Sequence, residues 1–336
     1  MVNKVDPNCG AAGGPVRRPS LAKLGRSDVA VGPLVFGGSP IAGLYSPVTE
    51  EDAQQCLAAA WEYGIRAFDT APHYGAGLSE ERLGAFLRER KRDEYVVSTK
   101  VGRLLVAAEN VPDGSEGFFG SRSRIRMRDY SRDGVVRSVE DSLARLSLER
   151  VDILLVHDPD DYVEVALRET LPALEELRSQ GLVRAIGIGV NDTALAEHFV
   201  RQATLDCVLI AGCYSLLVRG GQGGLFAECQ TRGVGVLVGG VFNSGILAGA
   251  DTNRYFNYEV APEEIVQRVQ RLSVVCARYN VTLGAAAIQF PLRDARVTSV
   301  VVGMRSRGEV ERNIADMALT IPDGLWEELD AVVEGD

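Results

Sequence analysis

The sequence predicts an α/β fold, a closed (β/α)8 barrel of the TIM type with an N-terminal β-hairpin that plugs the barrel bottom. Three observations support this fold class. Eight short apolar runs alternate with helical segments along the 336-residue chain, which is typical of a parallel sheet covered by helices. Eight such units in about 300 residues fit a closed barrel. No G-x-G-x-x-G follows the first run, which disfavours the alternative, a doubly wound open sheet.

The first element is predicted to be a short hairpin. Leu21–Leu24 and Val29–Val31 flank Gly25–Asp28, a segment with the composition of a turn. Because this hairpin precedes the first strand–helix unit, we expect it to lie under the barrel as a plug.

The strand–helix units follow in order. In the first unit, Thr49 is the predicted N-cap of a helix that stops at Gly64. Strands are predicted over residues 34–38, 66–68, 95–99, 152–156, 185–188, 207–210, 234–238 and 298–302. The helices that follow them are predicted over residues 49–63, 80–90, 134–146, 165–180, 193–202, 222–231, 262–279 and 306–317.

We expect two parts in the chain, a flexible N-terminal extension over residues 1–20 and a single barrel domain over residues 21–336. The extension is rich in Gly and Pro and has no hydrophobic signal-peptide core. No segment after it has the composition of a linker. Since no apolar run reaches the length of a membrane span, we expect a cytoplasmic protein.

Composition excludes several functions. The formal net charge of -10 argues against nucleic acid or an anionic membrane as the main partner, although it allows a local basic pocket. Three histidines are too few for a multi-histidine metal centre, so no metal is expected. Six scattered cysteines without a C-x-x-C pair indicate free, buried thiols: Cys9, Cys56, Cys207, Cys213, Cys229 and Cys276.

Ionisable side chains end three consecutive predicted strands. Asp69 ends the second strand, with Tyr74 five residues later, Lys100 ends the third and His157 the fourth. Active sites of these barrels lie at the carboxyl ends of the strands. Each residue alone has an ordinary structural explanation, but their coincidence on adjacent strands indicates a site.

A cation beside Tyr74 would change its acid–base chemistry. A free phenol has a pKa of about 10, which is too high for proton transfer near neutral pH. A charge at about 4 Å, in an effective dielectric of about 20, is worth at most about 4 kcal/mol or about 3 pKa units. We therefore expect Lys100 to bring the pKa of Tyr74 into a working range.

The segment Phe68–Gly75, the strand-final Lys100 and the Leu-Val-His run ending in His157 together resemble the aldo-keto reductase superfamily over about residues 21–331. The resemblance implies a barrel that binds a nicotinamide cofactor without a Rossmann fold and needs no metal. It further implies that Tyr74 is the general acid and base, that Asp69 orients Lys100, and that His157 donates a hydrogen bond to the substrate oxygen.

The resemblance also places the cofactor on the loops after strands seven and eight. A carboxylate at Glu309 and a glycine at Gly303, where NADP-preferring relatives often carry basic or amide side chains, favour NAD, while Arg305 and Arg307 leave NADP open. Ala211 and Gly239 stand where the family often has a Gln and a Tyr that hold the nicotinamide. The predicted cofactor contacts are Gly37, Asn191, Gly240, Phe242, Asn243, Ser244, Gly303, Arg305, Ser306, Glu309, Arg312 and Asn313.

The substrate is expected to be a small sugar or aldehyde. Polar residues at the rim, His73, Asp158 and Tyr45, would suit a polyol. A long loop over residues 102–133 is a candidate lid. We expect most of its arginines, Arg122, Arg124, Arg126, Arg128 and Arg132, to be solvated, with one or two as substrate donors.

The pattern resembles the family branch of L-fucose, D-threo-aldose and L-galactose 1-dehydrogenases and pyridoxal 4-dehydrogenases. The leading hypothesis is an NAD(P)-dependent aldose 1-dehydrogenase. The alternatives are a pyridoxal 4-dehydrogenase, an NADPH-dependent reductase of small aldehydes or ketones and, remotely, a nucleotide-sensing regulatory subunit. The oligomeric state does not follow from the sequence.

Overall fold

The computed structural model describes residues 21–120, 123–221, 223–249 and 255–335. The predicted extension over residues 1–20, with Cys9, lies outside the described residues. So do Arg122 and the first residue of the helix predicted over 222–231. The five described cysteines are buried and unpaired.

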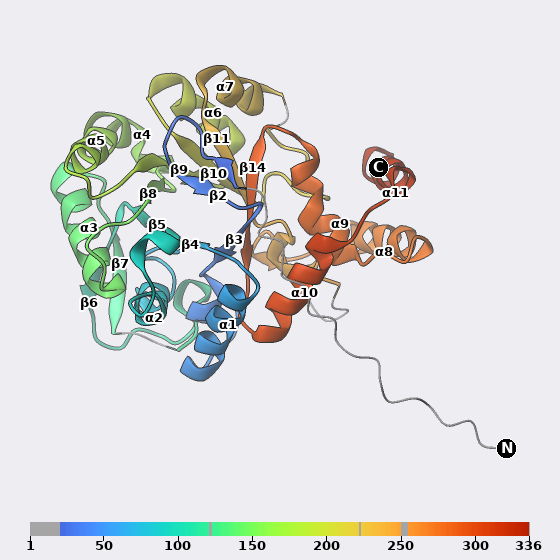
Figure 1. Cartoon of the computed structure of the whole chain (residues 1–336), viewed down its shortest axis with the longest axis horizontal. Helices are drawn as coiled ribbons and strands as arrows, with labels where there is room; N and C mark the ends of the chain where they lie inside the picture. The colour runs from blue at the N-terminus through green and yellow to red at the C-terminus, as the bar shows by residue number, and fades with distance from the viewer. Residues whose placement is uncertain (1–20, 121–122, 222, 250–254, 336) are drawn as a thin grey trace.

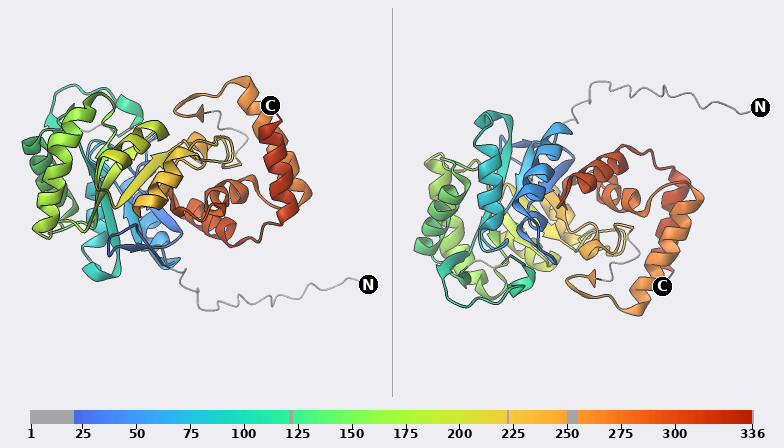
Figure 2. Two further views of the ribbon diagram at one scale, coloured as in Figure 1. Left: turned by 90° about the horizontal axis from the view of Figure 1, so that it is seen from above. Right: turned by 90° about the horizontal axis from the view of Figure 1, so that it is seen from below.

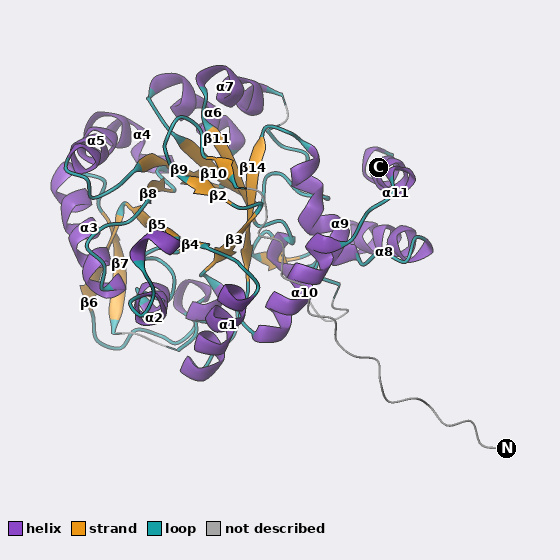
Figure 3. Ribbon diagram, viewed as in Figure 1, coloured by secondary structure: helices purple, strands orange, loops and turns teal. Residues whose placement is uncertain are grey.

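Eight parallel strands close into a barrel, which confirms the predicted fold class. Each barrel strand pairs with the next one along the chain, and the last, β14, returns to pair with the first, β3. Figure 3 shows the strands at the centre of a ring of helices. The barrel strands are β3 (Leu34–Gly37), β4 (Ala67–Asp69), β5 (Val96–Val101), β8 (Ile153–His157), β9 (Ala185–Val190), β10 (Cys207–Ala211), β11 (Gly235–Gly239) and β14 (Val297–Gly303).

Helices cover the outside of the barrel, close to the predicted positions. Those that follow barrel strands are α1 (Glu50–Glu62), α2 (Leu78–Leu87), α3 (Arg132–Leu146), α5 (Leu171–Ser179), α6 (Thr193–Gln202), α7 (Gly224–Arg232), α8 (Glu263–Arg278) and α10 (Arg307–Ala318). Thr49 caps α1 as predicted, because its side chain accepts from the Asp52 backbone N–H. The predicted helix over 165–180 is present with one irregular turn, since α4 (Val163–Val165) and a π-helical turn (Ala166–Thr170) lead into α5 with helical backbone angles at each junction.

Two further helices were not predicted, α9 (Leu283–Gln289) and α11 (Asp323–Glu334). Residues 283–288 of α9 are all buried, so the helix has no polar face and lacks the amphipathic period that marks a helix in a sequence. In Figure 1 the C-terminal helices α8 to α11 lie together on one side. Both views of Figure 2 place them away from α3 and α5.

The predicted hairpin plugs the barrel. Strands β1 (Ala22–Lys23) and β2 (Ala30–Val31) pair antiparallel. Leu24, Val29 and Val31 are buried against the inward-facing residues of the barrel strands, among them Leu155 and Leu209. This packing fills one end of the barrel and leaves the carboxyl ends of the strands as the open end. Among the described residues, no helix is long and apolar enough to cross a bilayer.

The segment over 102–133 differs from the unstructured loop that the sequence predicts. Strands β6 (Arg103–Ala107) and β7 (Arg124–Arg128) form an antiparallel hairpin. A second hairpin, β12 (Tyr255–Phe256) with β13 (Glu259–Val260), follows β11. Both hairpins belong to connections at the carboxyl ends of barrel strands, where they border the site described below.

Candidate active site

A buried cluster of three side chains lies at the carboxyl ends of β4 and β5. Lys100 Nζ donates to Asp69 Oδ2 at 2.7 Å, to Tyr74 OH at 3.1 Å and to the Thr70 carbonyl at 3.0 Å. The other Asp69 oxygen accepts from Ser98 Oγ at 2.6 Å. Asp69 and Ser98 are paired across the two strands, so strand register positions the carboxylate. The structure therefore brings together three of the four predicted catalytic residues through direct hydrogen bonds.

Burial governs the ionisation of this cluster. It disfavours the charge on Lys100, but Asp69 and Tyr74 together outweigh that effect and raise the pKa of Lys100. Burial also raises the pKa of Tyr74, and Lys100 offsets this only in part. Lys100 lowers the Tyr74 pKa as expected, but in the protein alone burial outweighs the lysine, with a smaller opposing effect of the Asp69 charge, so the pKa does not fall into the working range. Tyr74 is a protonated phenol near neutral pH.

The fourth predicted residue, His157, is the last residue of β8 and is buried beside the phenol. Its ring lies edge-on to that of Tyr74, with 6.0 Å between the ring centroids. Arg103 Nη1 lies 2.8 Å from His157 Nδ1, and Arg103 Nη2 donates to Asp158 Oδ2 at 2.8 Å. Burial, followed by the positive charges of Arg103 and Lys100, lowers the pKa of His157 well below its ordinary value.

The long connection after β5 forms one wall of the site. Phe118 stacks against Tyr74 with ring centroids 6.2 Å apart. The Glu116 carboxylate lies 3.2 Å from His73 Nδ1. Tyr45 N donates to the Gly117 carbonyl at 2.9 Å, which ties this wall to the segment after β3.

Most of the described arginines of this segment are open to solvent, as predicted: the side chains of Arg124, Arg128 and Arg132 are 38%, 43% and 55% exposed. Arg126 is the clearest exception to the prediction, since its side chain is only 5% exposed and donates twice to the His73 carbonyl. Its hydrogen bonds hold the backbone of the residue before Tyr74. The others pair with carboxylates: Arg124 with Glu81, Arg128 with Asp161 and Arg132 with Glu176.

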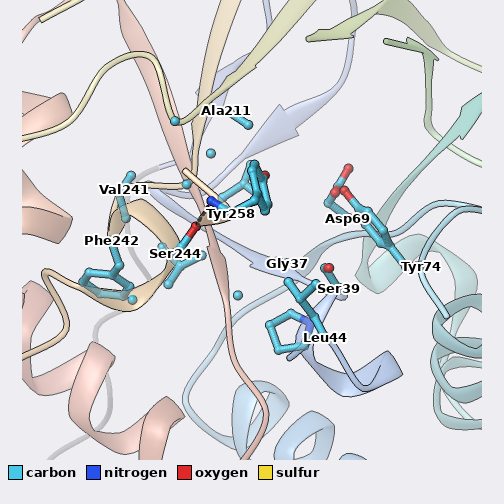
Figure 4. A pocket seen from close by; sticks show the side chains of 18 of the residues that line it. Gly37, Ser39, Leu44, Asp69, Tyr74, Ala211, Val241, Phe242, Ser244 and Tyr258 are labelled. Atoms are coloured by element: carbon cyan, nitrogen blue, oxygen red, sulfur yellow. Dashed lines mark hydrogen bonds between the residues drawn. The ribbon is translucent and has the colours of Figure 1, made fainter. Parts of the chain in front are cut away.

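One cavity of about 860 Å³ joins the acid–base cluster to the predicted cofactor loops. Figure 4 shows Asp69 and Tyr74 on one side of it and Phe242 and Ser244 on the other. All the predicted catalytic, cofactor and substrate residues line it, with Ser306 the exception. The Ser306 hydroxyl instead caps α10 by accepting from the Glu309 backbone N–H. The volume is in the range of small-molecule and cofactor sites.

Hydrogen bonds shape the loop after β11. Ser244 has a left-handed backbone (φ 62°), and its Oγ accepts from Tyr45 OH at 3.1 Å and from the Tyr258 backbone N–H at 2.8 Å. Tyr45 thus contacts this predicted cofactor loop as well as the cavity. Asn243 Nδ2 donates to Asn257 Oδ1 at 3.1 Å. The tip of the β12–β13 hairpin is therefore fastened to the loop, and Tyr258 faces Tyr74 across the cavity in Figure 4.

The segment after β14 carries charged residues of the predicted cofactor contacts. Glu309 Oε2 accepts from the Arg305 backbone N–H at 2.9 Å, so this carboxylate is held in place. A Cβ on Gly303 would lie 2.7 Å from Pro40 Cγ, which disfavours any larger side chain at this position. Arg312 lines the cavity and forms no hydrogen bond or ion pair with the part of the chain that the structure describes.

These residues fit a nicotinamide nucleotide. The loop of residues 240–245 and the N-terminus of the twelve-residue helix α10 can hold phosphates through backbone N–H groups. Asn191 lines the same cavity, and its side-chain amide has both a donor and an acceptor for a carboxamide. Among the described residues, no cluster of His, Cys, Asp or Glu side chains could hold a metal ion.

Sequence reasoning missed Glu116, Asn257 and Tyr258 in the cavity wall and Arg103 behind it. Three of the four lie on hairpins or turns far from the strand ends, where periodicity carries no signal. Arg103 is the exception, because a charged residue three positions after Lys100 and just beyond a strand end can be recognised in the sequence as a candidate site residue.

Fold and cluster together define a (β/α)8 barrel enzyme with ionisable side chains at the carboxyl ends of its strands. Residues 33–334 match the aldo/keto reductase family, and the chain belongs to that family. It is therefore an NAD(P)-dependent oxidoreductase that acts on CH–OH groups.

Individual relatives agree with this assignment. The chain is 41% identical over 318 residues to a D-threo-aldose 1-dehydrogenase of a Pseudomonas species, with 93% of this chain and 96% of the relative covered. It is 39% identical over 323 residues to a pyridoxal 4-dehydrogenase of Microbacterium luteolum, with 90% and 94% covered. The solved structure of a glycerol dehydrogenase from Gluconobacter oxydans shares the fold, with a TM-score of 0.76, 22% identity and coverage of 94% of this chain and 95% of that one. The resemblance predicted from the sequence is confirmed.

Proposed function

We propose that this enzyme oxidises the C1 hemiacetal of an aldose to a lactone, with NAD as the preferred cofactor. The observation that carries the proposal is the Asp69–Lys100–Tyr74 chain of hydrogen bonds, open to a cavity whose near end is lined by polar groups. Those groups are His73, Glu116 and Asp158, which suit a substrate with several hydroxyls. The similarity to an aldose 1-dehydrogenase supports the same substrate class.

Tyr74 handles the proton in this proposal. In oxidation, the phenolate of Tyr74 accepts the proton of the C1 hydroxyl; in reduction, the phenol returns it. Lys100 stabilises the phenolate through its 3.1 Å hydrogen bond, and Asp69 holds the ammonium in position. His157 donates a hydrogen bond to the C1 oxygen. The nicotinamide, when bound, supplies the hydride acceptor, so that one hydride and one proton leave the hemiacetal and a lactone carbonyl results.

The preference for NAD rests on Glu309. A carboxylate fixed at this position accepts hydrogen bonds from a free ribose and repels a 2′-phosphate. Arg312 is the opposing feature, because a guanidinium that has no partner among the described residues attracts the extra phosphate of NADP.

The experiment is a matrix of initial rates, with NAD+ and NADP+ against L-fucose, D-arabinose, L-galactose and pyridoxal, and with NADPH against small aldehydes. We expect lactone formation with NAD+. Reduction of aldehydes by NADPH without any sugar oxidation would contradict the proposal.

A substitution tests the role of Tyr74. The Tyr74→Phe variant should lose about 10²- to 10⁴-fold in kcat, because the proton acceptor is gone, and should keep its nucleotide Kd. Binding is measured by quenching of protein fluorescence. Retained turnover would show that another group transfers the proton.

A second candidate is oxidation of the hemiacetal form of pyridoxal. Phe118 offers an aromatic face beside Tyr74, and the Glu116 and Asp158 carboxylates could accept a hydrogen bond from a pyridinium N–H. The similarity to a pyridoxal 4-dehydrogenase supports this reading. A higher kcat/KM for pyridoxal than for every sugar would favour it.

A further inference from the structure

Arg103 joins the histidine of the site to its neighbouring carboxylate. It is the first residue of β6 and is only 9% exposed. One guanidinium nitrogen lies 2.8 Å from His157 Nδ1, and the other donates to Asp158 Oδ2 at 2.8 Å. A buried guanidinium that spans two polar partners is a rigid, two-pronged donor.

The chemistry of the two partners decides where the proton of His157 lies. An arginine side chain has only N–H donors and keeps its charge in proteins, so the ring nitrogen that it contacts must accept. A neutral imidazole has one accepting and one donating nitrogen. With Nδ1 accepting from Arg103, the single proton of the ring belongs to Nε2.

We infer that Arg103 is a positioning residue that holds His157 as the neutral Nε2–H tautomer and fixes the Asp158 carboxylate beside it. The site then presents one donor, Nε2–H, for the C1 oxygen and one acceptor, Asp158, for a neighbouring hydroxyl. The inference rests on the proposed function, because it takes His157 as the group that contacts the substrate oxygen.

Neighbouring groups make this arrangement depend on Arg103. Lys100 from β5, the Tyr74 ring and the His73 ring face His157 from the barrel and from the connection after β4. On the other side, Asp158 Oδ2 lies 3.5 Å from His157 Nε2. Without the guanidinium, this carboxylate would lack its partner and would attract a proton to the imidazole. Arg103 thus keeps the ring neutral and Asp158 available to a substrate hydroxyl.

The backbone around Arg103 is fixed. Gly102 has φ 107°, and a Cβ there would lie 2.2 Å from the Tyr130 ring. Tyr130 OH lies 2.5 and 2.7 Å from the carbonyl oxygens of His157 and Asp158, which share its single proton. The hairpin that carries Arg103 and the strand end that carries His157 are therefore locked together at two places.

The test replaces Arg103 and reads the protonation of His157 directly. With ¹⁵N-labelled protein, NMR distinguishes the two tautomers, and only three histidines need assignment. In the native enzyme we expect His157 as the Nε2–H tautomer, with its titration well below the ordinary range of a histidine. In Arg103→Met, we expect a mixture of tautomers and a titration that moves up toward the ordinary value of about 6.5. Arg128→Met, which alters the opposite residue of the same hairpin, is the matched control and should leave His157 unchanged.

Kinetics gives a second readout. Loss of a charge-assisted hydrogen bond should lower kcat/KM of Arg103→Met by about 10- to 100-fold, with a new dependence on pH between 6 and 8. Arg103→Lys keeps the positive charge but not the two-pronged geometry, so its kcat/KM should lie between those of the native enzyme and Arg103→Met. If Arg103→Met does not fold, Arg103→Lys serves as the test variant in its place.

Two results would overturn the inference: an Nδ1–H tautomer in the native protein, or an unchanged His157 spectrum in a folded Arg103 variant. The NMR experiment needs no substrate, so it stands or falls separately from the proposed sugar oxidation. Failure to oxidise any sugar with the expected His157 spectrum would contradict the proposed function alone.

Discussion

Replacing Lys100 by Met should destabilise the enzyme strongly, because it leaves the Asp69 carboxylate buried without a counter-charge. Lys100 and Asp69 are 2% and 4% exposed in their side chains, and their charged atoms lie 2.7 Å apart. Methionine keeps most of the apolar stem of lysine, so packing changes little. The charge and its three hydrogen bonds are what the substitution removes.

The magnitude follows from the geometry. Two unit charges 2.7 Å apart attract by about 6 kcal/mol at an effective dielectric of about 20. Desolvation of both groups offsets part of this, and removal of one partner from a buried pair costs about 3–5 kcal/mol in the free energy of unfolding. Asp69→Asn should cost a similar amount, since it leaves the ammonium unpaired. The double variant should be less destabilised than the sum of the two, by about 2 kcal/mol or more.

Urea denaturation followed by circular dichroism at pH 7 measures all four corners of this cycle. Thr49→Ala, which removes a surface helix cap, is a control for ordinary loss of stability of about 1 kcal/mol. Two results would refute a buried pair in which each charge compensates the other. One is a loss of unfolding free energy in the double variant equal to the sum of the two single losses. The other is a Lys100→Met variant whose unfolding free energy is less than 1 kcal/mol below that of the native enzyme.

Three further predictions concern the cofactor and pH. Glu309→Gln keeps an acceptor for the Arg305 backbone N–H but removes the negative charge. Calorimetry should then show that the ratio of the NADP+ Kd to the NAD+ Kd falls about tenfold. Glu311→Gln, at an exposed position, is the control and should leave this ratio unchanged. Because burial holds the pKa of Tyr74 above its ordinary value, kcat/KM for oxidation should rise with pH to beyond pH 10; a plateau near pH 8 would assign the base to another group. Burial lowers the pKa of His157, so below about pH 6.5 the unfolded chain takes up a proton that the folded enzyme does not. The free energy of unfolding should therefore fall as the pH falls, by up to about 1.4 kcal/mol per pH unit. If the free energy of unfolding of His157→Asn falls equally steeply with pH, the reasoning is contradicted.

The predicted strands and the acid–base residues were found for the same reason. Parallel strands that are buried on both sides are short apolar runs, and the residue at which such a run ends is visible in the sequence. Asp69 and His157 are the last residues of β4 and β8, and Lys100 lies one residue before the end of β5. Because the parallel strands form one barrel, their carboxyl ends lie at the same rim.

Periodicity failed where packing does not leave a polar face or where the chain forms irregular connections. Helix α9 is buried on all sides and was missed. The segment over 102–133 was read as a charged loop, although its strands β6 and β7 pair. The alternation of arginine with apolar residues over Arg124–Arg128 is the strand pattern of β7, whereas β6 has no such alternation.

The barrel, the order of its strands and three of the hydrogen-bonded partners at its rim follow from the residue pattern, because they depend on short-range periodicity and on the fixed geometry of parallel strands. Three other features depend on the folded chain: Tyr74 is a protonated phenol, Arg103 holds His157, which lies 54 positions away, and Tyr45 contacts Ser244, 199 positions away. Burial and contacts between distant segments are properties of the folded chain. They depend on how hairpins and turns pack over the barrel, which no local pattern of residues specifies.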